Sequence, residues 1–277
     1  MMLARRAASH LSGCRCRDHW RAHAVRDPKR RKQGAAVPPP PSPLPPVVVA
    51  GAAGAILGPL LDGIHSSVGL QIYDLYPVDI LDNHLHTSLL VPPLLASFYV
   101  VLSSLDAAAE QTLAEQTPAD QTPTPPPPAL GNNVAACYAS LAAGLALSAS
   151  LHSVGTAPPA AIAACLALFA AGNWWLFDRS GRGLALALLC ALVAPLAEAE
   201  LMARFGAWHY PRADVSVPVL FSGAFLPAGA SPLPPAVGFV SWVPLCYFFY
   251  APSVLLLGRK LRAARRERRE EDGVGTR

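Results

Sequence analysis

The distribution of basic residues is the feature that most constrains how this chain can fold. No Lys or Arg stands between Gln33 and Phe177, although the chain of 277 residues carries 22 of them. A soluble domain of that length needs charged side chains over its surface, and about a quarter of its residues are normally charged. Here 14% are charged and 52% are hydrophobic. We therefore interpret the chain as an integral membrane protein, whose lipid-facing helices need no polar face.

Six apolar segments are long enough to cross a bilayer as helices, since about 20 residues span a hydrocarbon core of about 30 Å. They are predicted at residues 47–63, 87–105, 134–151, 160–177, 183–199 and 240–257. The expected fold class is an all-α integral membrane protein, a bundle of six transmembrane helices with a disordered N-terminal arm. In the first segment Gly51, Gly54 and Gly58 recur at about one-turn spacing. They either let a neighbouring helix approach closely or reflect a glycine-rich span with no special partner face.

Charge and proline content predict the orientation and the domain boundaries. If both ends of the chain are cytoplasmic, 20 of the 22 basic residues lie on that side, as the positive-inside rule requires. Residues 1–46 form a basic, Pro-rich arm that is expected to be disordered, with a transit peptide as the alternative. The membrane domain is expected at 47–261, with a flexible linker at 106–131. Residues 262–277 are expected to form a charged cytoplasmic tail.

The end of the fourth segment carries a long and compositionally unusual string. Residues 173–183 read N-W-W-L-F-D-R-S-G-R-G, which places an aromatic pair at headgroup level before a tight polar turn. This string resembles the W-W-x-F-D-R-S-x-x-G turn of the Insig (insulin-induced gene) family. Further segments resemble other family motifs in the same order, namely His86–Pro93, Gly206–Tyr210 and Ser241–Cys246. The resemblance covers about Val47–Leu261.

The resemblance implies a non-enzymatic regulator of sterol metabolism in the endoplasmic reticulum membrane. Such a protein binds an oxysterol in its bundle and retains or regulates sterol-sensing partners, of the SREBP cleavage-activating protein or HMG-CoA reductase type. Asp178 matches the family aspartate at the partner-binding turn and, with Arg179, is the candidate partner site, although such a carboxylate can also simply cap the turn. The candidate sterol-lining residues are Trp174, Trp175 and Trp242, with interfacial anchoring as the simpler role. No cofactor is implied beside the sterol.

Departures from the family pattern keep an alternative open. Residues 144–151 read G-L-A-L-S-A-S-L where the family has a polar G-x-N-H-A-S-A-K stretch, so sterol or partner contacts there do not carry over. The alternative function is a small-solute transporter or channel of an organelle membrane. His84 and His86 lie near Asp79 but match no metal-ligand spacing, and no catalytic motif is recognised. Neither a metal site nor an enzyme activity is therefore predicted.

Overall fold

The computed structural model describes residues 44–82, 84–116, 133–220 and 234–274. Within them, six helices make up most of the structure. The helices are α1 (Pro46–Ser66), α2 (Val91–Gln116), α3 (Val134–Val154), α4 (Pro159–Phe177), α5 (Gly181–Phe205) and α6 (Val243–Val274). The predicted all-α, six-helix membrane fold is therefore confirmed. The arm that was expected to be disordered lies, up to residue 43, outside the described residues.

Of the six described helices, α1 to α5 are each long and apolar enough to cross a membrane. Helix α6 differs because only its first half, Val243–Leu257, is apolar. It then continues unbroken through a charged half, for 32 residues in all. The segment expected as a separate tail from residue 262 is therefore, as far as Val274, a continuation of this helix.

Two further predicted boundaries are wrong, and each misses helical structure. The linker was expected from residue 106, but α2 continues to Gln116 because Asp106 is anchored to neighbouring helices. Residues 117–132 lie outside the described residues. The fifth segment was expected to end at residue 199, but α5 runs through Pro195 and ends at Phe205. Pro195 removes one backbone donor without breaking the helix.

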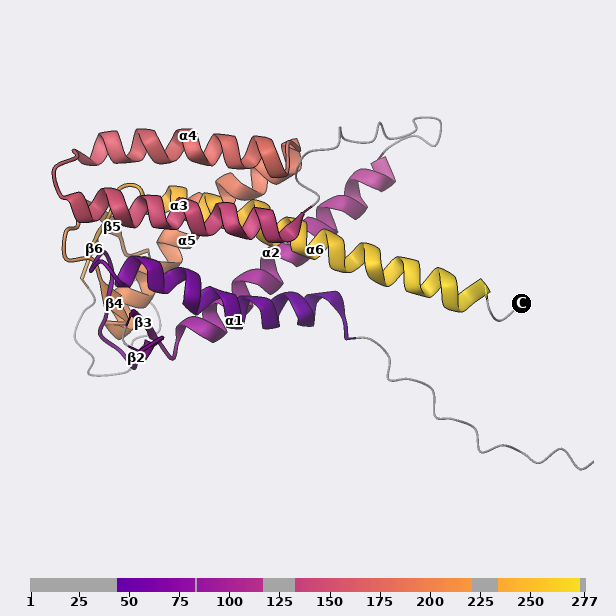
Figure 1. Cartoon of the computed structure of the whole chain (residues 1–277), viewed down its shortest axis with the longest axis horizontal. Coiled ribbons are helices and arrows are strands. Elements are labelled where there is room, and N and C mark those ends of the chain that lie inside the picture. The colour runs from indigo at the N-terminus through magenta and orange to yellow at the C-terminus, as the bar shows by residue number, and fades with distance from the viewer. Residues whose placement is uncertain (1–43, 83, 117–132, 221–233, 275–277) are drawn as a thin grey trace, which may run out of the picture. The chain divides into compact units, whose positions relative to one another are not determined.

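Short antiparallel strand pairs close one end of the bundle. The pairs are β1 (Ile72–Tyr73) with β4 (Trp208–His209), β2 (Pro77–Ile80) with β3 (Leu85–Ser88), and β5 (Val215–Pro218) with β6 (Ala236–Phe239). Figure 1 shows them gathered at one end, here called the strand end. The opposite end, here called the turn end, holds the turn between α4 and α5, and α6 extends past it (Figure 1).

Helix α6 is the central element, since it contacts each of the other five described helices. Its buried face includes Phe249, whose ring meets that of Phe169 on α4 edge to face at a centroid distance of 5.3 Å. Gly144 on α3 makes room for both rings, because a Cβ there would lie 2.7 Å from Phe169 and 2.9 Å from Phe249. Gly144 therefore serves the close packing of α3 against α4 and α6.

The glycines of α1 form the face against which α2 packs. A Cβ on Gly54 would lie 2.6 Å from the carbonyl oxygen of Leu95, and a Cβ on Gly58 would lie 2.3 Å from a methyl carbon of the same residue. Both distances are far below van der Waals contact. The sequence left two interpretations of this glycine pattern, and the structure supports close approach of a neighbouring helix.

Gly54→Ala should lower the stability of the protein. The added methyl would meet the backbone of α2, which cannot move aside as a flexible side chain would, and such overpacking costs about 1–3 kcal/mol. Gly172→Ala in α4 is the control, because nothing lies within 4 Å of a Cβ at that position. The measurement is the thermal unfolding midpoint of each purified protein in detergent. Equal midpoints for Gly54→Ala and the unmodified chain would contradict the packing argument.

Candidate functional site

A cavity of about 340 Å³ lies between α2 and α5. Apolar side chains form most of its wall, including Leu94, Phe98, Leu102, Cys190 and Leu201. Four further lining residues are 42–55% exposed, namely Val101, Leu105, Leu189 and Val193. Exposed apolar side chains on membrane-spanning helices face lipid. The cavity therefore opens toward the hydrocarbon core of the membrane.

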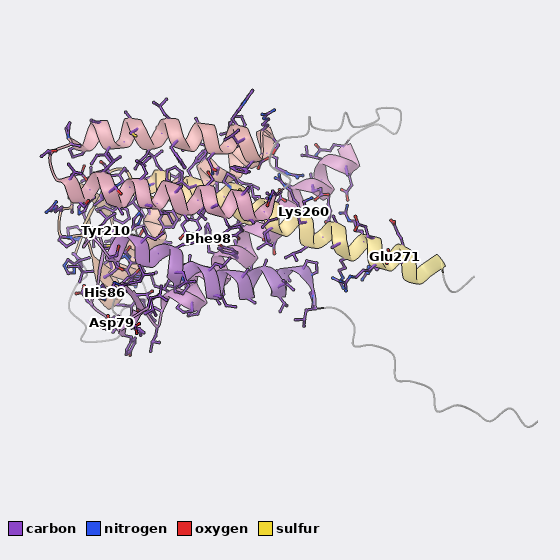
Figure 2. The ribbon with its side chains drawn as sticks, in the orientation of Figure 1. Asp79, His86, Phe98, Tyr210, Lys260 and Glu271 are labelled. Atoms are coloured by element: carbon purple, nitrogen blue, oxygen red, sulfur yellow. The ribbon has the colours of Figure 1, made fainter. Side chains whose placement is uncertain are left out.

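Glu198 of α5 lies in the wall of this cavity, toward the strand end, and is held by three aromatic donors. It is 3% exposed and accepts hydrogen bonds from Trp208 Nε1 at 2.6 Å and from the Tyr247 hydroxyl at 2.9 Å. The third donor is the hydroxyl of Tyr210, which Figure 2 shows at the strand end. Burial and then the neighbouring carboxylate raise the pKa of Tyr210 far above its usual range. Its hydroxyl therefore stays protonated and continues to donate.

Asp62 of α1 is the second carboxyl group in the cavity wall. Asp62 and Glu198 thus come from different helices and line the same cavity. In the part of the chain that the structure describes, no donor forms a hydrogen bond with Asp62. Gln71 adds an amide to the same wall, and none of the described lining residues is Lys or Arg. The cavity thus combines apolar walls with carboxyl and amide groups and no positive charge.

At the turn end, the Asp178 side chain is buried, whereas Arg179 is half-buried against the exposed Trp175. The Asp178 side chain is 1% exposed, and its Oδ1 pairs with Arg259 Nη1 of α6 at 3.1 Å. The same oxygen accepts a hydrogen bond from Ser180 N at 3.2 Å, which closes the turn. Arg179, with a positive φ of 56°, places its guanidinium 4.9 Å from the ring centroid of Trp175. Only Arg179 of the two predicted partner-binding side chains therefore faces outward.

Asp106 of α2 is the common anion for three arginines at this end. Its side chain is fully buried, with Arg262 Nη2 at 2.6 Å, Arg259 Nη2 at 2.9 Å and Arg182 Nε at 3.0 Å. A buried charge is tolerated only when it is closely paired. The Asp106 network, defined here as these four side chains, joins α2, α5 and α6, and through Arg259 it includes the α4–α5 turn.

The three tryptophans predicted to contact sterol lie elsewhere in the bundle. Trp174 donates from Nε1 to the Ser180 carbonyl at 3.3 Å, and the buried Trp242 donates to Ser148 Oγ at 3.2 Å. Trp175 is exposed. None of the three is among the described residues that line the cavity, whereas Trp208 is. A sterol contact at Trp174, Trp175 or Trp242 stays a prediction.

The pair of Asp79 and His86 spans the β2–β3 hairpin at the strand end (Figure 2). The Asp79 carboxylate lies 2.6 Å from His86 Nδ1, and both side chains are about half exposed. Among the described residues, no three side chains of His, Cys, Asp or Glu converge as metal ligands would. The pair is therefore best explained as a cross-strand contact that holds the hairpin.

Comparisons with solved structures find a similar architecture in a bacterial Insig homologue. No family model matches the chain, and no curated protein matches it. A crystal structure of MvINS, an Insig homologue from Mycobacterium vanbaalenii, is similar with a TM-score of 0.53 and 19% identity over 77% of this chain and 92% of that one. A cross-linked MvINS trimer gives 0.54 and 19%, over 79% and 94%. The chain therefore has the Insig-like helical membrane fold, and the expected resemblance is confirmed for the fold.

Gly183→Ala should disrupt the α4–α5 turn. A Cβ on Gly183 would lie 1.7 Å from Asp178 Oδ2, so the carboxylate must leave its position beside Arg259. The expected cost in unfolding free energy is on the order of 2 kcal/mol, less than for a fully buried pair because Arg259 is 25% exposed. Gly181→Ala, with nothing within 4 Å of its Cβ, is the control. The measurement is the thermal unfolding midpoint of each variant. Equal midpoints for Gly183→Ala and Gly181→Ala would contradict this prediction.

Proposed function

We propose that this chain is an Insig-like, non-enzymatic membrane regulator that binds a neutral, hydroxyl-bearing lipid of the sterol class between α2 and α5. The observation that carries the proposal is the make-up of the cavity, which is apolar over most of its wall and presents the carboxyl groups of Asp62 and Glu198. Carboxyl and amide groups hydrogen-bond a hydroxyl readily. None of the described lining residues is Lys or Arg, so a phosphate in the cavity would have no countercharge, and an unpaired charge is costly in a medium of low dielectric constant.

The dimensions of the cavity suit a rigid, elongated lipid. Its lining positions on α2 run from Val91 to Leu105, a span of about 21 Å at about 1.5 Å per residue. Its volume of about 340 Å³ lies within the usual range for small-molecule sites. An oxysterol combines a flat apolar body with hydroxyl groups, which matches both the walls and the carboxyl groups.

Regulation by such a ligand would act through α2 and α5, which contribute to both ends of the bundle. These helices form the cavity walls and also supply Asp106 and Arg182 to the Asp106 network. A ligand that changes the separation of α2 and α5 would therefore change the conformation of the turn that carries Asp178 and Arg179. Binding of a partner there is coupled to the ligand only if the ligand's affinity differs between the free and the partner-bound states.

The partners proposed for this turn are sterol-sensing membrane proteins, of the SREBP cleavage-activating protein or HMG-CoA reductase type. The proposed location is the endoplasmic reticulum membrane, with both termini cytoplasmic. The support for this assignment is the Insig-like fold together with the W-W-x-F-D-R-S turn of residues 174–180.

Ala194→Phe should weaken sterol binding, because the bulky ring would fill the cavity that Ala194 lines. The matched control is Ala185→Phe on the same helix, where the side chain is exposed and does not line the cavity. The measurement is labelling by a photoreactive oxysterol in membranes, competed by unlabelled sterol. We expect saturable labelling to fall by about tenfold or more, which corresponds to about 1.4 kcal/mol of binding energy. The proposal would be refuted if Ala194→Phe were labelled as strongly as the unmodified protein, or if the unmodified protein were not labelled at all.

Arg179→Ala should reduce partner binding without destabilising the protein, because Arg179 lies outside the Asp106 network. We expect about tenfold less of any specific membrane partner to co-purify, the effect of losing about 1.4 kcal/mol. The thermal unfolding midpoint should be unchanged. Asp178→Ala, by contrast, should lower both the amount of co-purifying partner and the unfolding midpoint, because it also removes the contact with Arg259. If Arg179→Ala retains every co-purifying protein, the turn is not a partner site.

The transporter alternative is favoured by one observation, the presence of Asp62 and Glu198 inside the bundle, because ionisable groups at such positions often mark proton or solute pathways. Against it, the cavity opens toward lipid through exposed apolar side chains. Reconstitution into vesicles separates the two functions. Solute or proton flux that Glu198→Gln abolishes would favour the transporter.

A further inference from the structure

A second groove, of about 400 Å³, lies at the turn end among the start of α1, the later turns of α2 and the charged half of α6. We call it the arginine groove because four arginines of α6 line it: Arg262, Arg265, Arg266 and Arg269. Their spacing puts them on one face of the helix. The first residues of α1 and polar side chains of α2 complete the lining.

The acidic residues of this part of α6 lie outside the groove. Glu267, Glu270 and Glu271 are not among its lining residues, and Figure 2 labels Glu271 on the extension of α6 past the bundle. Lys260 and Arg268 are also absent from the lining. The helix therefore turns one basic face toward the groove and keeps its acidic side chains on others.

Two of the four arginines form ion pairs with described residues of α2, and two do not. Arg262 pairs with Asp106 at 2.6 Å and with Glu110 at 3.2 Å, and Arg266 reaches Glu110 at 3.4 Å. Arg265 and Arg269, in contrast, form no ion pair within the described parts of the chain. The groove consequently keeps uncompensated positive charge, which a bound anion would neutralise.

Two buried hydrogen-bond donors in the groove wall also have no acceptor. The Ser103 hydroxyl belongs to a residue that is 5% exposed, and neither Ser103 Oγ nor Arg262 Nε has a hydrogen-bond partner among the described residues. Unsatisfied buried donors are costly and are normally paired with protein, water or ligand. An oxyanion in the groove would supply countercharge for Arg265 and Arg269, beside these two unsatisfied donors.

We propose that the arginine groove binds the phosphate of an anionic lipid headgroup. Arginine forks match the oxygen geometry of a phosphate. The groove also lies where α6 changes from its apolar to its charged half after Leu257, which is the level of the membrane headgroups. Val47 and Ala107 add apolar surface to the lining, suited to the glycerol and upper acyl carbons of a lipid. This site is separate from the sterol cavity and does not depend on it.

Binding is tested on the full chain, purified in a neutral detergent. The probes are short-chain phosphatidic acid, short-chain phosphatidylcholine and inorganic phosphate, and the readout is the ligand-dependent rise in thermal unfolding midpoint. We expect phosphatidic acid to stabilise the protein saturably. Phosphatidylcholine and inorganic phosphate at the same concentration should not. Equal stabilisation by inorganic phosphate would assign the groove to a free anion and overturn the lipid assignment.

The variant pair Arg265→Gln with Arg269→Gln tests the site itself, because it removes the two unpaired charges. Lys260→Gln with Arg268→Gln is the control, since it removes the same charge from positions outside the groove. We expect the phosphatidic acid affinity to fall by about tenfold or more in the first pair and less than about twofold in the second. Both pairs should melt like the unmodified chain without ligand. Equal losses of affinity in the two pairs would mean that phosphatidic acid is attracted only by the overall positive charge of α6. That result would refute the proposed binding site.

Discussion

The buried carboxylate of Asp106 organises the turn end of this protein. Lipid provides little hydrophobic force between helices, so their association depends on close packing and on polar contacts. The glycine face of α1 supplies the first, and the Asp106 network supplies the second. Because Arg259 contacts both Asp106 and Asp178, the α4–α5 turn keeps its shape only while that network is intact. The conformation of the proposed partner site, which follows α4, therefore depends on a residue of α2, two helices earlier in the chain.

The two hollows of the bundle have opposite electrostatic character. The cavity between α2 and α5 contains two carboxyl groups and no described basic side chain, whereas the arginine groove contains four arginines. On the proposed assignments, the lipid-facing cavity would take a neutral hydroxyl lipid and reject a phosphate, which finds no countercharge there. The arginine groove at headgroup level would take an anionic headgroup. The two proposed sites would then distinguish lipids by charge.

The sequence predicted the helices because their signal is local. Hydropathy over about 20 residues and the absence of basic residues locate the spans without any tertiary information. Asp106 was assigned to a linker, since acids ahead of a Pro run are typical of one, and only the arginines of α6 show why it is helical. Asp62 and Glu198 were visible as acids at the ends of apolar segments. Their convergence on one cavity depends on α2 and α6, which each contact both α1 and α5, and no local pattern encodes that packing.

Helix α6 connects all of these features in one unbroken element. Tyr247 contacts Glu198 beside the cavity, Arg259 contacts Asp106, and Arg265 and Arg269 line the groove. Arg269 lies about 21 Å along the helix from the buried Leu255. Between these two residues, Arg259 and Arg262 bind Asp106 of α2. A change in the separation of α2 and α6 beside the cavity would therefore also change the width of the arginine groove, which the same two helices line.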